Sequence, residues 1–133
     1  MKFNDNIPIY LQIKEEIENA IITSSLKEEE AIPSIRTLAQ QYRLNPQTVS
    51  NAVSELLTQG VLFKKRGIGM FVEKGAQTKL TKAKRKKFLE IELKICIEKS
   101  KSLGLTKTEL IKTIEANYIH EESITSFKDK GGK

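Results

Sequence analysis

The sequence predicts a mainly α-helical fold that contains one small β-hairpin. Hydrophobic residues recur every three or four positions in three successive segments before residue 60, which is the spacing of amphipathic helices. Two short β-prone runs around a glycine-bearing turn follow them, and two more helical segments come after residue 77. Of the 133 residues 38% are hydrophobic and only 6% are aromatic, so we expect a core made of Ile, Leu and Val.

The first helix is predicted over about residues 8–23. Pro8 suits the first helical position, where its missing N–H costs nothing. The apolar positions that follow recur at helical spacing: Ile9, Ile13, Ile17, Ala20 and Ile21. Acidic side chains lie between them, so this helix has one buried and one solvated face.

A short second helix over residues 35–42 and a third helix over about residues 46–59 are predicted next. Ile32-Pro33 favours extended backbone before Ser34, which is a good N-cap for the second helix. Asn45-Pro46 repeats this arrangement three residues after the second helix, and Gly60 ends the third. Two helices joined by so short a connection form a helix-turn-helix.

The third helix has two different faces. Its apolar stripe consists of Val49, Ala52, Val53, Leu56 and Leu57. The opposite face is polar, uncharged and rich in small residues: Gln47, Ser50, Asn51 and Ser54. Asn and Gln amides match the N6 and N7 groups of adenine in the DNA major groove, and Ser is more permissive. An isolated polar face is more often only solvated, so its meaning depends on its neighbours.

A basic β-hairpin follows the third helix directly. Residues 61–65 and 70–72 are β-prone, and Arg66-Gly67-Ile68-Gly69 forms the turn between them. Lys64, Lys65 and Arg66 make its tip cationic, which suits phosphate groups or a neighbouring groove. A helix-turn-helix with such a hairpin is a winged helix-turn-helix, and it favours DNA binding by the third helix.

The C-terminal part is predicted to be a two-helix dimerisation segment. A helix over residues 80–103 carries more apolar residues than one stripe, and a capping box of Thr106 with Glu109 starts the second helix. Two helices alone bury too little surface to stand independently, so a second subunit is expected to cover them. The expected dimer contacts are Phe88, Leu89, Leu93, Cys96, Ile97, Leu110 and Ile114. The predicted domains are therefore residues 1–76 and 77–126, followed by a flexible tail over 127–133.

Charge and composition exclude several classes of protein. Residues 1–76 carry nine basic and nine acidic side chains, whereas residues 77–133 carry fourteen and eight, which gives the whole net charge of +6. One cysteine and one histidine leave no metal site, no cofactor site and no catalytic pair to propose. No apolar run is long enough to span a bilayer, and the start lacks a signal peptide. We therefore expect a cytoplasmic protein that is not an enzyme and has no membrane partner.

Several spaced motifs resemble the GntR family of transcriptional regulators. They are Ile32-Pro33-Ser34-Ile35-Arg36-Thr37-Leu38-Ala39, Asn45-Pro46-Gln47-Thr48-Val49, Gly60-Val61-Leu62 and Arg66-Gly67-Ile68-Gly69-Met70-Phe71-Val72. The opening Pro8-Ile9-Tyr10-Leu11-Gln12-Ile13 and the turn Leu103-Gly104-Leu105-Thr106 are most similar to the YtrA subfamily. Pro46 departs from the pattern, since many members of the family have a base-reading Arg there.

The resemblance implies contacts with double-stranded DNA at named positions. They are Arg36, Gln47, Thr48, Ser50 and the hairpin around Gly67, and Asn45 either caps its helix or reads a base. It further implies a homodimeric repressor of a palindromic operator, often in an operon for an ABC transporter. The sequence names no small-molecule effector.

Two other functions remain open at this point. A winged helix can serve protein contacts, although the basic hairpin tip argues against that use. The basic run Lys79–Lys87 is either a solvated linker or a further phosphate clamp, and a clamp would also suit a nonspecific nucleic-acid binder. Equal affinity for operator and random DNA would favour the nonspecific binder.

Overall fold

The computed structural model describes the backbone of residues 3–132 and the side chains of residues 3–119. The described chain is mainly helical and contains one two-stranded antiparallel hairpin, as the sequence predicts. It divides into two compact units, Met1–Lys86 and Lys87–Lys133, so the boundary lies after Lys86 rather than after residue 76. In the described part, no helix is long and apolar enough to cross a membrane.

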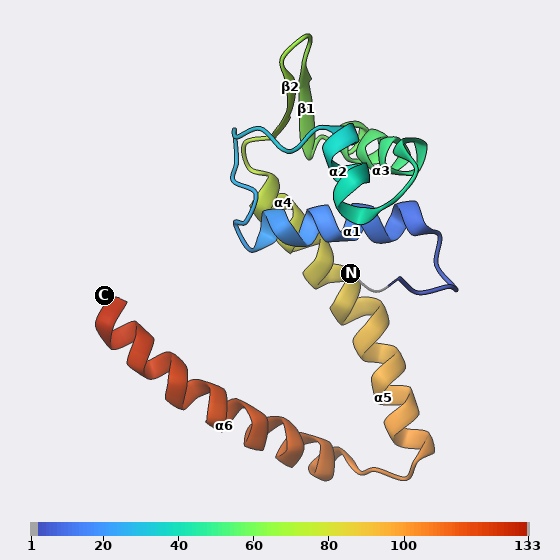
Figure 1. Cartoon of the computed structure of the whole chain (residues 1–133). Coiled ribbons are helices and arrows are strands. Elements are labelled where there is room, and N and C mark those ends of the chain that lie inside the picture. The colour runs from blue at the N-terminus through green and yellow to red at the C-terminus, as the bar shows by residue number, and fades with distance from the viewer. Residues whose placement is uncertain (1–2, 133) are drawn as a thin grey trace. The chain divides into compact units, whose positions relative to one another are not determined.

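Three helices form the body of the first unit: α1 (Ile9–Ile22), α2 (Ile35–Tyr42) and α3 (Pro46–Thr58). Both α1 and α2 pack against α3, and the hairpin projects from this body on the side away from α1 (Figure 1). The buried core joins residues from every element of the unit: Ile13, Ile17, Ile21, Ile32, Leu38, Ala39, Val49, Ala52, Val53, Leu56, Val61, Leu62, Met70, Val72, Ala76 and Leu80. Aliphatic side chains dominate it, which confirms the prediction from composition.

The hairpin pairs β1 (Leu62–Lys65) with β2 (Gly69–Val72), and its register sets the first residue of β1 opposite the last residue of β2. The connection between α1 and α2 runs along the outer edge of β2. There the Ile32 N–H donates to the Met70 carbonyl at 2.9 Å, and Ala31 bridges to Phe71. This pairing satisfies backbone groups of an edge strand and anchors the base of the hairpin to the helices.

Helix α4 (Ala76–Lys87) begins four residues before the helix that the sequence predicts over residues 80–103. Its first residue and Leu80 are buried in the core of the first unit. The Glu28 carboxylate accepts hydrogen bonds from the N–H groups of Gly75 and Gln77 at 3.0 and 3.1 Å, which satisfies donors at the helix start. Residues nearly fifty positions apart therefore attach α4, and this explains the later domain boundary.

The second unit contains a π-helical turn over Phe88–Glu92, then α5 (Leu93–Ser102) and α6 (Lys107–Gly132). The single helix predicted over residues 80–103 is thus interrupted by a turn in which the backbone hydrogen bonds span five residues instead of four. The predicted capping box is confirmed, because the Glu109 N–H donates to Thr106 Oγ1 at 3.1 Å and the Thr106 N–H donates to Glu109 Oε1 at 3.3 Å. The backbone of α6 continues through residues 127–132 of the expected tail, and Lys133 lies outside the described residues.

Candidate nucleic-acid interface

The start of α3 is held by a side-chain cap and a proline. Asn45 Oδ1 accepts a hydrogen bond from the Gln47 N–H at 2.8 Å, and Pro46 occupies the first turn. Asn45 is therefore an N-cap here, one of the two roles that the sequence leaves open for it. The cap leaves the first turn of α3 rigid and accessible, which is the end of a recognition helix that contacts base edges.

The packing of α3 sets which side chains face outward. Val49, Ala52, Val53 and Leu56 are buried, which orients the whole helix about its axis. Gln47, Asn51 and Ser54 are exposed on the other side, and Thr48 and Ser50 are half-buried beside them. The exposed face is thus polar and without formal charge, as the sequence predicts.

Two amides on this face are joined to each other. Gln47 Nε2 donates to Asn51 Oδ1 at 3.0 Å, one helical turn further along α3. Sequence analysis identifies both residues but treats them as separate. Their spacing of four positions was the signal that could have indicated the bond.

Helix α2 begins with a second side-chain cap. Ser34 Oγ accepts a hydrogen bond from the Thr37 N–H at 3.1 Å, which confirms the predicted N-cap. Arg36 lies in the first turn of α2 and is exposed. A guanidinium at this position can reach a phosphate or a groove edge without any rearrangement of the helix.

The hairpin tip is cationic and sharply turned. Lys64, Lys65, Arg66 and Gly67 are all exposed, and the Ile68 N–H closes the turn onto the Lys65 carbonyl at 3.0 Å. Gly67 has a φ of 77°, which a residue with a side chain rarely adopts. The glycine therefore serves the turn itself, and the two lysines and the arginine supply the charge.

Lys65 also contributes to the packing of the hairpin. The Phe63 and Phe71 rings stack with their centroids 5.5 Å apart, and Lys65 Nζ lies 4.8 Å from the Phe71 centroid. An exposed ammonium over such a ring stabilises it by about 0.5–1 kcal/mol. This pair of aromatic rings was missed by sequence analysis, although the register of the hairpin places the two rings opposite each other.

Two cations of the basic run Lys79–Lys87 are bonded within the first unit. Lys79 Nζ donates to the Gln59 carbonyl at the end of α3, and Lys84 Nζ forms an ion pair with Glu18 of α1 at 3.3 Å. These two cations attach α4 to the body of the first unit. Lys82 and Arg85 are exposed instead. The run is therefore part of the folded unit rather than a linker.

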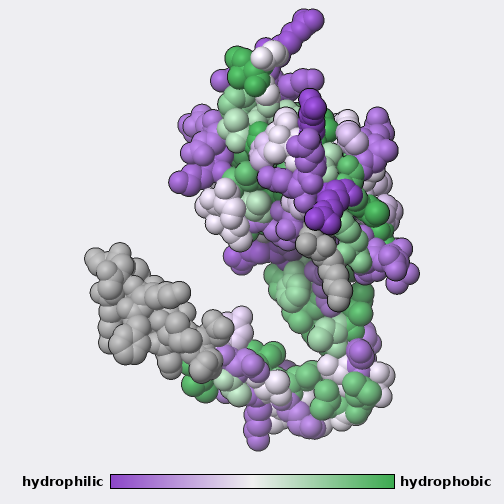
Figure 2. Space-filling view, in the orientation of Figure 1, coloured by the Kyte–Doolittle hydropathy of each residue, from purple (hydrophilic) through white to green (hydrophobic). Residues whose placement is uncertain are grey.

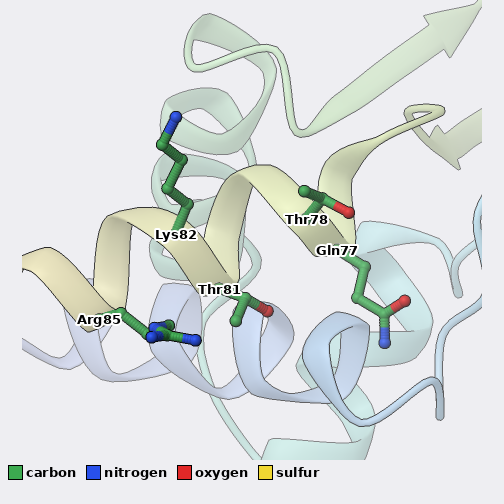
Figure 3. Close-up of a pocket in the computed structure, with 5 residues that line it drawn as sticks. All are labelled: Gln77, Thr78, Thr81, Lys82 and Arg85. Carbon is green, nitrogen blue, oxygen red and sulfur yellow. The ribbon is translucent and has the colours of Figure 1, made fainter.

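A cavity of about 490 Å³ lies against α4 (Figure 3), and its lining residues are Gln77, Thr78, Thr81, Lys82 and Arg85. All five come from this helix, and their side chains project outward without meeting at one point. The Gln77 amide is used within the fold, since Nε2 donates to the Ile22 carbonyl at 2.7 Å. An effector site needs polar groups that converge, and this surface has none that do.

The expected dimer contacts are accessible in the single chain. Phe88, Leu89, Cys96, Ile97 and Ile114 are exposed, whereas Leu93 and Leu110 are half-buried. Cys96 is a free cysteine and is not buried within its own chain. Figure 2 shows hydrophobic surface over α5, and no hydrophobic side chain of the second unit is buried among those described.

The described residues contain no group of three or more His, Cys, Asp or Glu side chains that could hold a metal ion.

The known proteins that this chain resembles are transcriptional regulators. The profile of "Bacterial regulatory proteins, gntR family" matches residues 9–72. The chain is 32% identical to the uncharacterized HTH-type transcriptional regulator YhcF of Bacillus subtilis over 114 residues, which cover 86% of this chain and 93% of YhcF. It is 35% identical to the HTH-type transcriptional repressor YtrA of Bacillus subtilis over 77 residues, 58% of this chain and 59% of YtrA.

Among solved structures, a GntR family transcriptional regulator from Listeria monocytogenes superimposes with a TM-score of 0.73 at 28% identity. The match covers 86% of this chain and 98% of that chain, so it includes both units. The family profile covers the helix-turn-helix and the hairpin, which are the elements that form the interface described above. The chain therefore belongs to the GntR family of bacterial regulatory proteins and is a DNA-binding transcriptional regulator rather than an enzyme.

Proposed function

We propose that this regulator is a sequence-specific repressor of the YtrA-like group that binds a palindromic operator as a homodimer. The observation that carries this proposal is the juxtaposition, within one unit, of a capped α3 with an uncharged polar face and a hairpin with a cationic tip. Amides and hydroxyls read base edges, whereas cations bind phosphates irrespective of sequence. A protein that bound DNA only by charge would not need the polar face.

Each group of residues has a distinct task in this proposal. Gln47, Ser50 and Asn51 face the bases of the major groove. Arg36 and Thr48 lie near the starts of their helices and contact the DNA backbone beside the major groove. The tip formed by Lys64, Lys65, Arg66 and Gly67 contacts phosphates or the adjacent minor groove.

The homodimer is supported by the surface of the second unit. Phe88, Leu89, Ile91 and Ile95 each expose half or more of their surface, as do Ile114 and Tyr118 of α6. Soluble monomers rarely expose so many large apolar side chains in one segment. Two copies related by a two-fold axis would cover the same surface on both at once, and they would place two recognition helices on half-sites about one helical turn apart or a multiple of it.

Repression is supported by the name of one relative. YtrA, to which the chain is 35% identical over 77 residues, is called a repressor. A dimer that occupies an operator represses most simply by excluding other proteins from the promoter. In this proposal the regulator acts in the cytoplasm on its own operon, for which the resemblance implies an ABC transporter.

Nonspecific nucleic-acid binding through Lys79–Lys87 is the second candidate. Its support is weaker, because Lys79 and Lys84 of this run are bonded within the protein. A protein-binding winged helix is weaker still, since the exposed tip carries Lys64 and Arg66 rather than an apolar surface.

The direct test is a footprint of the full-length protein on the DNA upstream of its own gene. The proposal predicts two protected half-sites with two-fold symmetry. It also predicts an affinity at least on the order of a thousandfold above that for random DNA of the same length. Equal affinity for both DNAs would contradict it and support the nonspecific binder.

A further inference from the structure

The hydrogen bond between Gln47 and Asn51 joins two side chains on the DNA-facing side of α3. Gln47 Nε2 donates to Asn51 Oδ1 at 3.0 Å, and both residues are exposed. Their backbone is fixed from two directions, by the Asn45 cap on the Gln47 N–H at 2.8 Å and by the buried Val49 between them. The two amides are therefore bonded to each other in the free protein, on a backbone that the cap and the core hold in place.

The bond leaves a mixed pair of groups for a ligand. A side-chain amide carries one carbonyl oxygen and one NH2 group. With Gln47 Nε2 and Asn51 Oδ1 used against each other, the Gln47 oxygen and the Asn51 NH2 are presented outward. If both amides turn over, Asn51 donates to Gln47, and the pair presents the Gln47 NH2 and the Asn51 oxygen. Both arrangements present one donor and one acceptor.

This pattern matches one base in the major groove. Adenine presents the N7 acceptor next to the N6 donor, whereas guanine presents two acceptors, N7 and O6. A donor–acceptor pair satisfies both groups of adenine, but against guanine it sets oxygen against oxygen. We propose that Gln47 and Asn51 act as a single reading unit for one A·T pair in each half-site. This inference rests on the proposed sequence-specific function.

Selection of binding sites from random duplex DNA tests the inference with the full-length protein. Wild type is expected to select an A·T pair at one position of each half-site. Gln47→Ala and Asn51→Ala should both lose the preference at that same position. Each should lower the affinity for the selected site on the order of tenfold to a hundredfold, and the double variant should bind no more weakly than the weaker single variant. Thr58→Ala, which removes an exposed hydroxyl from the C-terminal end of the same helix, is the matched control and should keep the wild-type preference.

A modified base separates base reading from a structural effect. Replacing the selected adenine by 7-deazaadenine removes the N7 acceptor while keeping the base pair. This should weaken wild type severalfold and leave the double variant unchanged.

Three results would overturn the inference. In the first, the two single variants lose base preference at two different positions of the site. In the second, the affinity losses of the single variants multiply in the double variant. In the third, the wild-type protein selects a site that contains no preferred A·T pair. In all three cases the proposed sequence-specific function would stand, because wild type still selects a site. A wild type that selects no sequence would overturn both.

Discussion

The two units of this regulator differ in how far their hydrophobic side chains are buried. In the first unit Ile13, Val49 and Leu56 have no exposed surface, whereas in the second Leu89 and Ile95 expose 54% and 65% of theirs. Both sets recur at helical spacing, but those of the second unit occupy more than one stripe of their helix. In the proposed homodimer this difference is a division of labour, in which the first unit completes its core within one chain and the second uses its apolar surface for assembly.

A charge placed on the apolar surface of α5 is expected to have the largest effect. Ile97→Glu should convert the dimer to a monomer, because an ionised carboxylate cannot be buried unpaired between two subunits. Loss of the second DNA-binding unit should lower operator affinity by roughly 10²–10⁴-fold. Sedimentation velocity and operator titration measure the two effects.

The matched control for that variant is Lys112→Glu. It places the same side chain at an exposed position of α6, about 200° around the helix from the expected contacts Leu110 and Ile114. It should remain dimeric and keep tight operator binding. Equal dissociation in both variants would mean that the apolar face is not the interface.

Two matched truncations compare the cores of the units. Leu56→Ala removes a fully buried side chain and should lower the free energy of unfolding of the first unit by about 2–5 kcal/mol. Ile95→Ala removes a side chain that is 65% exposed within its own chain and is covered only in the proposed dimer. It should therefore change the stability of the first unit by less than about 0.5 kcal/mol. Thermal unfolding followed by circular dichroism measures both. A comparable loss in Ile95→Ala would contradict the division into units.

Removal of one cation from the hairpin tip should have a smaller effect that does not depend on sequence. Arg66→Ala should weaken binding to operator and random DNA alike and lower the slope of log K against log salt by about one. Lys112→Ala, an exposed cation of α6, should leave the slope unchanged. An unchanged slope in Arg66→Ala would mean that the hairpin tip does not contact the DNA backbone.

The smallest expected effect is a pH dependence of the first unit. Hydrogen bonds from the N–H groups of Gly75 and Gln77 hold the pKa of the Glu28 carboxyl below its ordinary value of 4.5. A lowered pKa stabilises the folded state above about pH 4.5, and this contribution is lost as the pH falls through the folded pKa. Glu28→Gln should therefore lower the midpoint of thermal unfolding at neutral pH and flatten its fall in acid. A variant with the wild-type unfolding midpoint both at neutral pH and in acid would contradict the role given to Glu28.

Sequence reasoning succeeded where the determining contacts are local. Ser34 and Asn45 cap the helices that they precede, and Thr106 with Glu109 forms the expected capping box. Each bond spans two or three residues, so the residue types and their spacing contain the information. The fold and the outward face of α3 followed from these signals and from the apolar stripes.

Sequence reasoning was incomplete where the contacts join residues that are distant in sequence. The start of α4 depends on Glu28, and the amide of Gln77 reaches Ile22 across 55 positions. Nothing in the composition of residues 77–79 indicates these partners, so the sequence predicts a helix only from residue 80 onward. The π-helical turn over Phe88–Glu92 likewise has no local signature, since it changes only the hydrogen-bond spacing within an otherwise helical run.

The measurement that tests the division of labour most directly is the behaviour of the fragment 1–86, compared with the full chain. It retains Ala76 and Leu80, which belong to the core of the first unit, and lacks the apolar surface of the second. The account predicts that the fragment unfolds cooperatively, sediments as a monomer and binds operator DNA far more weakly than the dimeric full chain. A fragment that is unfolded, or one that remains a dimer with full operator affinity, would contradict it.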